Sequence, residues 1–451
     1  MVELLLAAPA SGSGKTTVTC ALLAALAKRG LSPCAFKCGP DYIDPMFHRS
    51  VMGVESHNLD LFLCPKERMR MLYERCIAGH KAAVCEGAMG FYDGVGGSTP
   101  QASAWHVAKT LGLAVLLVIR PKGASLTLAA QIKGLCSFRE NSGIRGIFLN
   151  DCSAMLFASL APMLERETGL PVLGYLPHME EAAFQSRHLG LYTASEIKGL
   201  QHRISVLSQK MEETTDMPRL LELFSGQDPA GAFYSKKPSA KAAIAVAQDE
   251  AFCFTYAETL DAFQEAGAQI VPFSPLHDTA LPEKIGGLYL PGGYPELYAV
   301  RLSQNESMCR CIRSAIGKGM PTVAECGGFL YLGQSLEDES GHTCSMAKVL
   351  SGSGVQKQKL VRFGYANLTA KTGSLLFEKG EHIPVHEFHY WDSTENGQAF
   401  KAEKPVSARS WLCGFADKNL YAAFPHLYFW GNPQWAERFV QAAAQYAKLE
   451  E

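Results

Sequence analysis

The segment Ala8-Pro9-Ala10-Ser11-Gly12-Ser13-Gly14-Lys15-Thr16-Thr17 decides the fold of the N-terminal half, because it lies between a short apolar run and a helical pattern. A glycine-rich loop in this position surrounds phosphates with backbone N–H groups, directs a lysine to the β and γ oxygens and offers a hydroxyl to Mg²⁺. Gly14, Lys15 and Thr16 satisfy this pattern, whereas Pro9 takes the place of the usual first glycine. The competing interpretation is a Gly/Ser turn that only leads into a helix. The strand–loop–helix context favours a nucleotide-phosphate site.

Buried apolar runs alternate with amphipathic segments along the rest of the N-terminal half. This alternation is typical of βαβ units and predicts an α/β fold with a doubly wound parallel sheet. The predicted strands are Val2–Ala8, Ala82–Cys85, Ala114–Ile119, Gly146–Leu149 and Val172–Tyr175, and the predicted helices are Thr17–Arg29, Lys66–Ala78 and Ser125–Phe138. A second α/β pattern follows, with strands expected at Ala242–Ala247, Gln269–Phe273, Gly287–Leu290 and Thr322–Ala324. We expect two doubly wound domains, residues 1–192 and 241–451, with a helical segment and linker over residues 193–240.

Composition excludes several functional classes. The 451 residues are 47% hydrophobic and 19% charged, which is close to the average of globular proteins and rules out a disordered chain. A formal charge of −2 lacks the basic excess that general nucleic-acid or membrane-surface binding requires. The longest later apolar run, Leu113–Ile119, is too short to cross a bilayer. Fourteen cysteines without a C-x-x-C pair are read as reduced thiols, which predicts a cytoplasmic protein.

Two acidic clusters follow the predicted phosphate loop in the chain. Asp41 and Asp44 lie within Phe36-Lys37-Cys38-Gly39-Pro40-Asp41-Tyr42-Ile43-Asp44-Pro45, and Glu86 and Asp93 lie within residues 86–94, directly after a predicted strand. Carboxylates at the carboxyl ends of parallel strands face the crevice where such sheets bind ligands, and Mg²⁺ prefers these oxygens. The alternative is that the aspartates are ordinary turn residues before proline or glycine.

A possible nucleophile lies in the C-terminal half. Cys326 in Pro321-Thr322-Val323-Ala324-Glu325-Cys326-Gly327-Gly328-Phe329 is placed at a sharp turn between a strand and a helix. Such a turn exposes the nucleophile, and the N–H of Gly327 can stabilise an oxyanion. A second turn, residues 290–296 with Gly293, could supply the other donor. The activating base should be a histidine distant in the chain, and spacing leaves three candidates open: His386, His389 and His426.

Taken together, these motifs resemble the cobyrinic acid a,c-diamide synthase family over nearly the whole chain. The resemblance rests on Ser11–Thr17, Phe36-Lys37 with residues 39–45, Glu86-Gly87 with Met89-Gly90, residues 291–296, residues 325–328 and His386-Glu387-Phe388-His389-Tyr390. Members join a dethiobiotin-synthetase-like ATPase domain to a class I glutamine amidotransferase domain. The family also accepts Pro9 in the phosphate loop. Cobyric acid synthases, a related group, carry a different sequence after Phe-Lys.

The family resemblance implies roles for individual residues. Cys326 would be the nucleophile and His426 the base, with oxyanion donors at Gly293 and Gly327. The residue two positions after the base is Tyr428, where typical class I enzymes have a glutamate, so what orients His426 is open. ATP phosphates would bind the loop residues Gly12, Ser13, Gly14, Lys15, Thr16 and Thr17, and Mg²⁺ would bind Thr16, Asp41 and Glu86. The candidate substrate residues are Lys37, Asp41, Tyr42, Asp44 and Asp93, of which Asp44 and Asp93 would lie near the carboxylate that is amidated. Apart from the resemblance, Tyr42, Phe91, Tyr92 and Arg120 are candidates for the wall around the macrocycle, and the alternative is ordinary crevice packing or a surface cation.

The implied activity is amidation of the a and c acetates of cobyrinic acid, driven by MgATP and supplied with ammonia from glutamine. Ni-sirohydrochlorin or hydrogenobyrinic acid are alternative acceptors for the same chemistry. Two other classes stay open: a P-loop switch with an inactive amidotransferase-like half, and a tetrapyrrole carrier. Expected partners are these small molecules and a second copy of the chain, with neither nucleic acid nor membrane.

Overall fold

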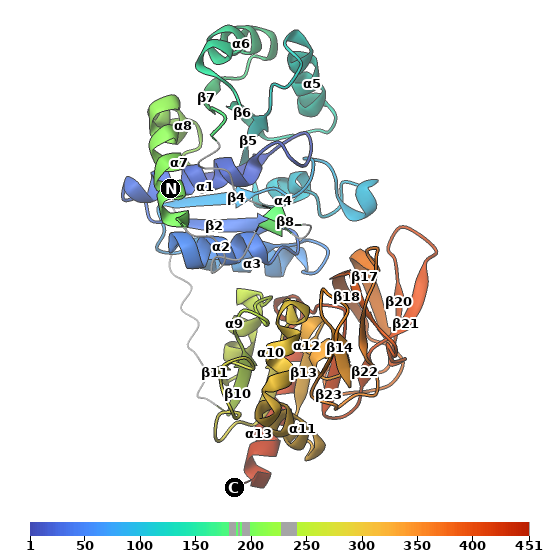
Figure 1. The fold of residues 1–451 in the computed structure, drawn as a ribbon. Coiled ribbons are helices and arrows are strands. Elements are labelled where there is room, and N and C mark those ends of the chain that lie inside the picture. The colour runs from blue at the N-terminus through green and yellow to red at the C-terminus, as the bar shows by residue number, and fades with distance from the viewer. Residues whose placement is uncertain (180–185, 188–189, 192–198, 227–240, 451) are drawn as a thin grey trace. The chain divides into compact units, whose positions relative to one another are not determined.

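The computed structural model describes residues 1–179, 186–187, 190–191, 199–226 and 241–450 (Figure 1). The chain divides into two compact units, Met1–Tyr234 and Ser235–Glu451. Within the predicted helical segment and linker, residues 193–240, the structure describes residues 199–226. Two helices from the segment 193–240, α7 (Leu200–Thr214) and α8 (Met217–Leu223), belong to the first unit and pack into its core.

A seven-stranded sheet forms the centre of the first unit, in the order β3-β2-β4-β1-β5-β6-β7, with all neighbouring strands parallel. This confirms the predicted parallel α/β fold. The strands are β1 (Val2–Ala7), β2 (Pro33–Cys38), β3 (Ser56–Leu59), β4 (Ala82–Glu86), β5 (Ala114–Ile119), β6 (Ile144–Asn150) and β7 (Val172–Leu176), with a separate pair β8 (Ser186–Arg187) and β9 (Gly190–Leu191). The predicted set omits β2 and β3, which form one edge of the sheet.

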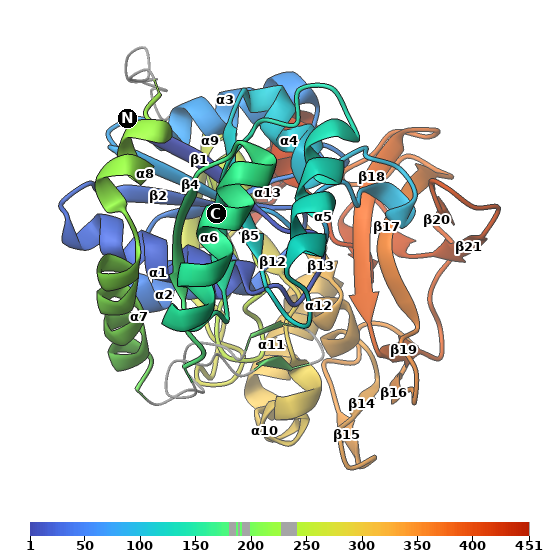
Figure 2. The ribbon, with the colours of Figure 1, turned by 90° about the horizontal axis from the view of Figure 1, so that it is seen from above.

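Helices flank this sheet. They are α1 (Lys15–Lys28), α2 (Ile43–Met52), α3 (Lys66–Ile77), α4 (Ala104–Leu111), α5 (Leu126–Ser137) and α6 (Ala154–Thr168), with the short 3₁₀ helix η1 (Val95–Gly97). The helix α7 lies alongside α1 (Figure 2). Its Leu207 and Met211 join Leu22 and Leu26 of α1 in one buried cluster. The phosphate loop connects the carboxyl end of the central strand β1 to α1, so this topology places it in the middle of the sheet edge where ligands bind.

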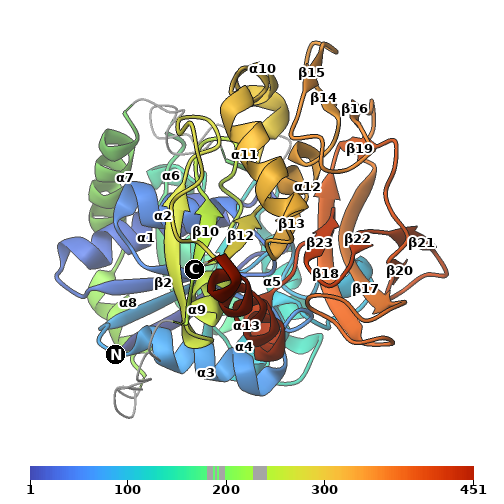
Figure 3. The same cartoon turned by 90° about the horizontal axis from the view of Figure 1, so that it is seen from below.

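The second unit contains a six-stranded sheet in the order β11-β10-β12-β13-β23-β22, parallel except for β22. Its strands are β10 (Ala242–Ala247), β11 (Ala268–Phe273), β12 (Gly287–Leu290), β13 (Thr322–Glu325), β22 (Phe415–Ala416) and β23 (Leu420–Ala423). Alternate side chains of these strands pack into two hydrophobic cores, one on each face of the sheet. One core includes α9 (Ala257–Glu265) and α13 (Pro433–Glu450), and the other includes α10 (Ala299–Gln304) and α11 (Glu306–Gly317). Figure 3 shows α13 and α9 together over one face of this sheet.

Two further sheets complete the second unit. One has the order β15-β14-β16-β19 and the other β18-β17-β20-β21. Their strands are β14 (Ser335–Glu337), β15 (Thr343–Ser345), β16 (Gly354–Gln356), β17 (Arg362–Ala370), β18 (His382–His389), β19 (Trp391–Ser393), β20 (Phe400–Glu403) and β21 (Ser410–Cys413), with helix α12 (Gly327–Tyr331) and the 3₁₀ helices η3 (Pro295–Tyr298) and η4 (Phe429–Gly431). Within the described residues, no helix is both long and apolar enough to span a bilayer.

Candidate active sites

The phosphate loop of the first unit folds around the amino end of α1. Gly14 is the residue before the helix and has a φ of 89°. The Ser13 hydroxyl donates to the Ala10 carbonyl at 2.9 Å, which closes the loop on itself. The Lys15 ammonium donates to the Met89 carbonyl at 2.5 Å and is almost fully buried. The loop therefore presents a helix amino terminus and a lysine at one place, which together attract phosphate.

A buried ion network lies beside this loop. Lys37 of β2 and Glu86 of β4 are paired in register across two parallel strands, and the Lys37 ammonium donates to Glu86 Oε1 at 2.7 Å and to Asp44. The Thr16 hydroxyl donates to the same Glu86 oxygen at 2.6 Å. Burial alone would lower the pKa of Lys37, but the surrounding carboxylates outweigh burial and raise it. Lys37 is therefore a fixed positive charge that holds the acids together.

The oxygens around Thr16 fit a magnesium ion. Glu86 is fully buried, and among the described residues its Oε2 has no hydrogen-bond partner, so this oxygen is available to a cation. Asp44 Oδ2 lies 3.5 Å from the Thr16 hydroxyl. Asp41 is placed differently: its Oδ1 accepts from the backbone N–H of Ile43 at 2.8 Å, and its Oδ2 lies 3.7 Å from Lys37. Hydroxyl and carboxylate oxygens are the ligands that Mg²⁺ prefers.

The remaining predicted substrate residues have varied surroundings. Tyr42 is the residue before α2, and Asp93 Oδ2 accepts from the Gly90 N–H at 2.9 Å, which fixes the turn after β4. The Tyr92 hydroxyl donates to the Leu135 carbonyl at 2.6 Å. Phe91 is buried against the Tyr92 ring, and Arg120 forms an ion pair with Asp151. Phe91, Tyr92 and Arg120 thus already have structural contacts within the first unit.

The charge of Lys15 predicts a pH dependence for nucleotide binding. Burial lowers the pKa of Lys15 to about 8. Only the protonated lysine attracts phosphate, so binding is strong below this pKa and weakens as the pH rises through it. We expect the affinity for MgATP to fall about tenfold between pH 7 and pH 9, measured by titration calorimetry. The control Lys15→Met should bind weakly at both pH values, and a wild-type affinity that stays constant over this range would contradict the prediction.

Cys326 occupies the turn between β13 and α12 in the second unit. Its φ is +47°, in the left-handed region that residues other than glycine rarely adopt. Strain of this kind is typical of a nucleophile held at a sharp strand-to-helix turn. Burial raises the pKa of the Cys326 thiol. The thiol is therefore protonated near neutral pH, and its reaction needs a base.

His426 is brought to Cys326 by the loop after β23. A Cβ atom built on Gly292 would lie 2.6 Å from Cε1 of His426 and 3.5 Å from Cβ of Cys326, so all three residues meet at one point. A Cβ atom on Gly327 would lie 3.1 Å from the backbone nitrogen of Gly293. The two predicted oxyanion donors are therefore adjacent, next to the thiol and the imidazole.

The other two candidate histidines have different surroundings. The His386 and His426 backbones are paired, with the His426 N–H donating to the His386 carbonyl at 2.9 Å. Burial lowers the pKa of His386 to about 3, which keeps this imidazole neutral. His389 is stacked on Phe424 at 3.8 Å between ring centroids, and its Nδ1 lies 2.7 Å from the Trp391 carbonyl. Of the three, His426 is the one that Gly292 places against Cys326.

Glu325 is a site residue to which sequence reasoning gave no role. Its Oε2 lies 3.6 Å from Nδ1 of His426 and accepts a hydrogen bond from the Tyr289 hydroxyl at 3.1 Å. Its Oε1 accepts from the Leu427 N–H at 3.0 Å, and the side chain is buried. Tyr428, in the usual glutamate position, instead packs edge-on against Tyr256. The available signal was a charged residue at the end of the otherwise uncharged strand Thr322–Glu325.

Comparisons with known proteins assign each half of the chain to a known domain family. Residues 4–190 match the CobQ/CobB/MinD/ParA nucleotide binding domain, and residues 243–434 match the CobB/CobQ-like glutamine amidotransferase domain. Cobyrinate a,c-diamide synthase from Caldanaerobacter subterraneus subsp. tengcongensis is 37% identical over 446 residues, which cover 97% of each chain. The chain belongs to the cobyrinate a,c-diamide synthase family.

Further members of this family match over similar lengths. The Clostridium tetani enzyme of the same name is 37% identical and aligned over 98% of this chain and 100% of its own. The Salmonella typhimurium enzyme is 38% identical over 97% of each chain. These matches confirm the predicted family, the two-domain architecture, and the assignment of a nucleotide-binding domain and an amidotransferase domain to the two halves.

Proposed function

We propose that the protein is a glutamine-dependent ligase that amidates the a and c acetate groups of cobyrinic acid, using ATP and Mg²⁺. The observation that carries the proposal is the near full-length similarity, at 34–38% identity, to proteins named cobyrinate a,c-diamide synthase. The phosphate loop with Gly14, Lys15 and Thr16 and the proximity of His426 to Cys326 support it. The fourteen cysteines form no disulfide, which fits the proposed cytoplasmic location.

The first unit would activate the carboxylate. A carboxylate is a poor electrophile because its oxygen is a poor leaving group, so transfer of the γ-phosphoryl group to it creates an acyl phosphate that ammonia can attack. Lys15 and the amino end of α1 would neutralise the charge that develops on the phosphates. Thr16, Glu86 and a carboxylate of residues 41–44 would hold Mg²⁺, which would help to neutralise the negative charge of the phosphates. Lys37 would keep the acids in place.

The second unit would release ammonia from glutamine. His426 would take the proton from the Cys326 thiol as its sulfur attacks the side-chain amide carbon, and the imidazolium would then protonate the departing ammonia. The N–H groups of Gly293 and Gly327 would stabilise the oxyanion in each tetrahedral step. Water, deprotonated by His426, would finally hydrolyse the thioester to glutamate.

Glu325 would serve as the positioning residue for His426. A carboxylate facing Nδ1 keeps the Nδ1–H tautomer, so that Nε2 is free to accept the thiol proton, and it stabilises the imidazolium that forms. The separation of 3.6 Å exceeds a hydrogen bond, and such contacts commonly shorten when substrate binds. Tyr428 stands where typical class I enzymes have the glutamate that orients the base. In the proposed triad, Glu325, the residue before the nucleophile, would take that role.

Mass spectrometry of the product tests the proposed function. The purified protein would be incubated with MgATP, glutamine and one ring acid at a time. The three separate reactions would contain cobyrinic acid, hydrogenobyrinic acid or Ni-sirohydrochlorin. We expect two successive replacements of hydroxyl by amino groups on cobyrinic acid. Amidation of only another ring would change the assigned substrate. No product with any ring, even with free ammonia, would overturn the ligase and favour a switch or a carrier.

A further inference from the structure

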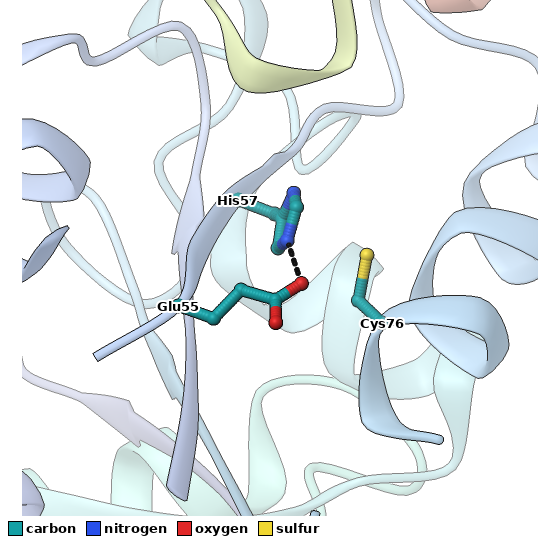
Figure 4. Close-up of side chains that lie close together, drawn as sticks. All are labelled: Glu55, His57 and Cys76. Atoms are coloured by element: carbon teal, nitrogen blue, oxygen red, sulfur yellow. Dashed lines mark hydrogen bonds and ion pairs between the residues drawn. The ribbon is translucent and has the colours of Figure 1, made fainter. Parts of the chain in front are cut away.

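Three side chains with metal-binding atoms meet at the edge of the N-terminal sheet. Glu55 precedes the edge strand β3, His57 lies within it, and Cys76 lies in the last turn of α3. One potential ligand atom from each lies within 4.8 Å of the other two (Figure 4). The cluster is at the amino ends of the parallel strands, opposite the phosphate loop, so the proposed catalytic chemistry does not account for it.

Two of the three potential metal ligands are buried, and the third is accessible to solvent. His57 and Cys76 are each 5% exposed, whereas the Glu55 side chain is 49% exposed. An ion would therefore have two ligands fixed by the packing of β3 and α3, with an open side through which to enter. One nitrogen, one sulfur and one oxygen form a mixed set that suits Zn²⁺, whereas Mg²⁺ and Ca²⁺ prefer oxygen ligands alone.

His80 holds the accessible carboxylate in place. Its Nε2 lies 3.3 Å from Glu55 Oε2, and its Nδ1 lies 3.0 Å from the Ser32 carbonyl. The other carboxylate oxygen, Oε1, lies 2.8 Å from Nε2 of His57. Each oxygen of Glu55 thus faces a different imidazole, although the side chain borders solvent. Outer partners of this kind orient the carboxylate ligands of metal sites.

We propose that Glu55, His57 and Cys76 bind one Zn²⁺ ion, with His80 orienting Glu55 and water as the fourth ligand. Tetrahedral zinc places a nitrogen and an oxygen ligand about 3.3 Å apart, and a nitrogen and a sulfur about 3.6 Å apart. Both separations lie within the spacing of the cluster, and the Glu55–His57 contact has to lengthen by only about half an ångström. The ion would connect the edge strand β3 to the end of α3.

Metal content and cobalt spectroscopy of the whole protein test this site. The protein would be loaded with either Zn²⁺ or Co²⁺ and then desalted. Excess Mg²⁺ would be present in both cases to saturate the acids near Thr16. We expect one retained zinc per chain and, with Co²⁺, a near-ultraviolet thiolate-to-cobalt charge-transfer band. Absence of both would overturn the proposal.

Matched variants assign the signal. Cys76→Ser should lose the charge-transfer band, and Glu55→Gln should weaken zinc retention at least tenfold. The second change is at an exposed side chain of the same size, so it tests the site even if Cys76→Ser fails to fold. Unchanged ammonia-dependent amidation would show that each variant is folded. Cys136→Ser and Cys326→Ser are controls that should keep the band, and loss of the band only in Cys326→Ser would place the metal at the glutaminase site and overturn the proposal.

Discussion

Replacing Cys326 with serine is expected to abolish glutamine-dependent amidation and to leave ammonia-dependent amidation intact. The Cys326 thiol is the proposed nucleophile that attacks glutamine. A serine hydroxyl is a far weaker nucleophile at neutral pH. The expected loss in kcat for glutamine hydrolysis is on the order of a thousandfold or more. Glutamate release and amide formation would be measured on the same samples, with glutamine or with ammonium salt as nitrogen donor.

The comparison between the two nitrogen donors separates catalysis from folding. A misfolded first unit would lose both activities, whereas loss of the nucleophile alone spares the ATP-dependent step in that unit. Cys309→Ser is a suitable control because Cys309 is also a buried cysteine of the second unit, and its sulfur lies 3.5 Å from the Tyr331 hydroxyl. Retention of glutaminase activity by Cys326→Ser would contradict the assigned nucleophile.

Changing Glu325 to glutamine is expected to lower kcat for glutamine hydrolysis by about a hundredfold or more, with little change in KM. The amide can still accept from the Leu427 N–H, but its NH₂ group would face Nδ1 of His426. That contact favours the tautomer with the proton on Nε2, which cannot accept a proton from the thiol. Steady-state kinetics with glutamine, together with the pH dependence of Cys326 alkylation, would report the change.

Two further variants distinguish positioning from general packing. Tyr289→Phe removes a hydrogen bond to the same carboxylate but keeps its charge, and it should lower kcat less than tenfold. Glu325→Asp keeps the charge and should recover part of the lost activity. If Glu325→Gln and Tyr289→Phe had equal effects, the carboxylate would be a packing element and the proposed triad would be wrong.

Local sequence patterns were sufficient to predict the phosphate loop, the Cys326 turn and most strands of the N-terminal sheet. The phosphate loop and the Cys326 turn are short segments whose glycine spacing allows few backbone conformations, so they can be recognised without knowing what surrounds them. The apolar runs at β1, β4, β5, β6 and β7 predicted the parallel sheet because strands buried on both faces are continuous in hydrophobicity. Strand β2 was missed because it contains Lys37, whose burial is compensated by Glu86, 49 residues further along the chain.

The tertiary structure decided which polar residues act together. Asp44 rather than Asp41 lies against the Thr16 hydroxyl, His426 rather than His389 lies against Cys326, and Glu325 faces His426 across 101 residues of sequence. Strand register and loop packing determine which residues form these pairs. Neither can be inferred from the spacing of residues along the sequence. The sequence by itself determined the two kinds of chemistry, because each depends on a contiguous motif. Only the folded chain determined the partners that orient and neutralise those motifs, because such contacts join residues that are distant in sequence.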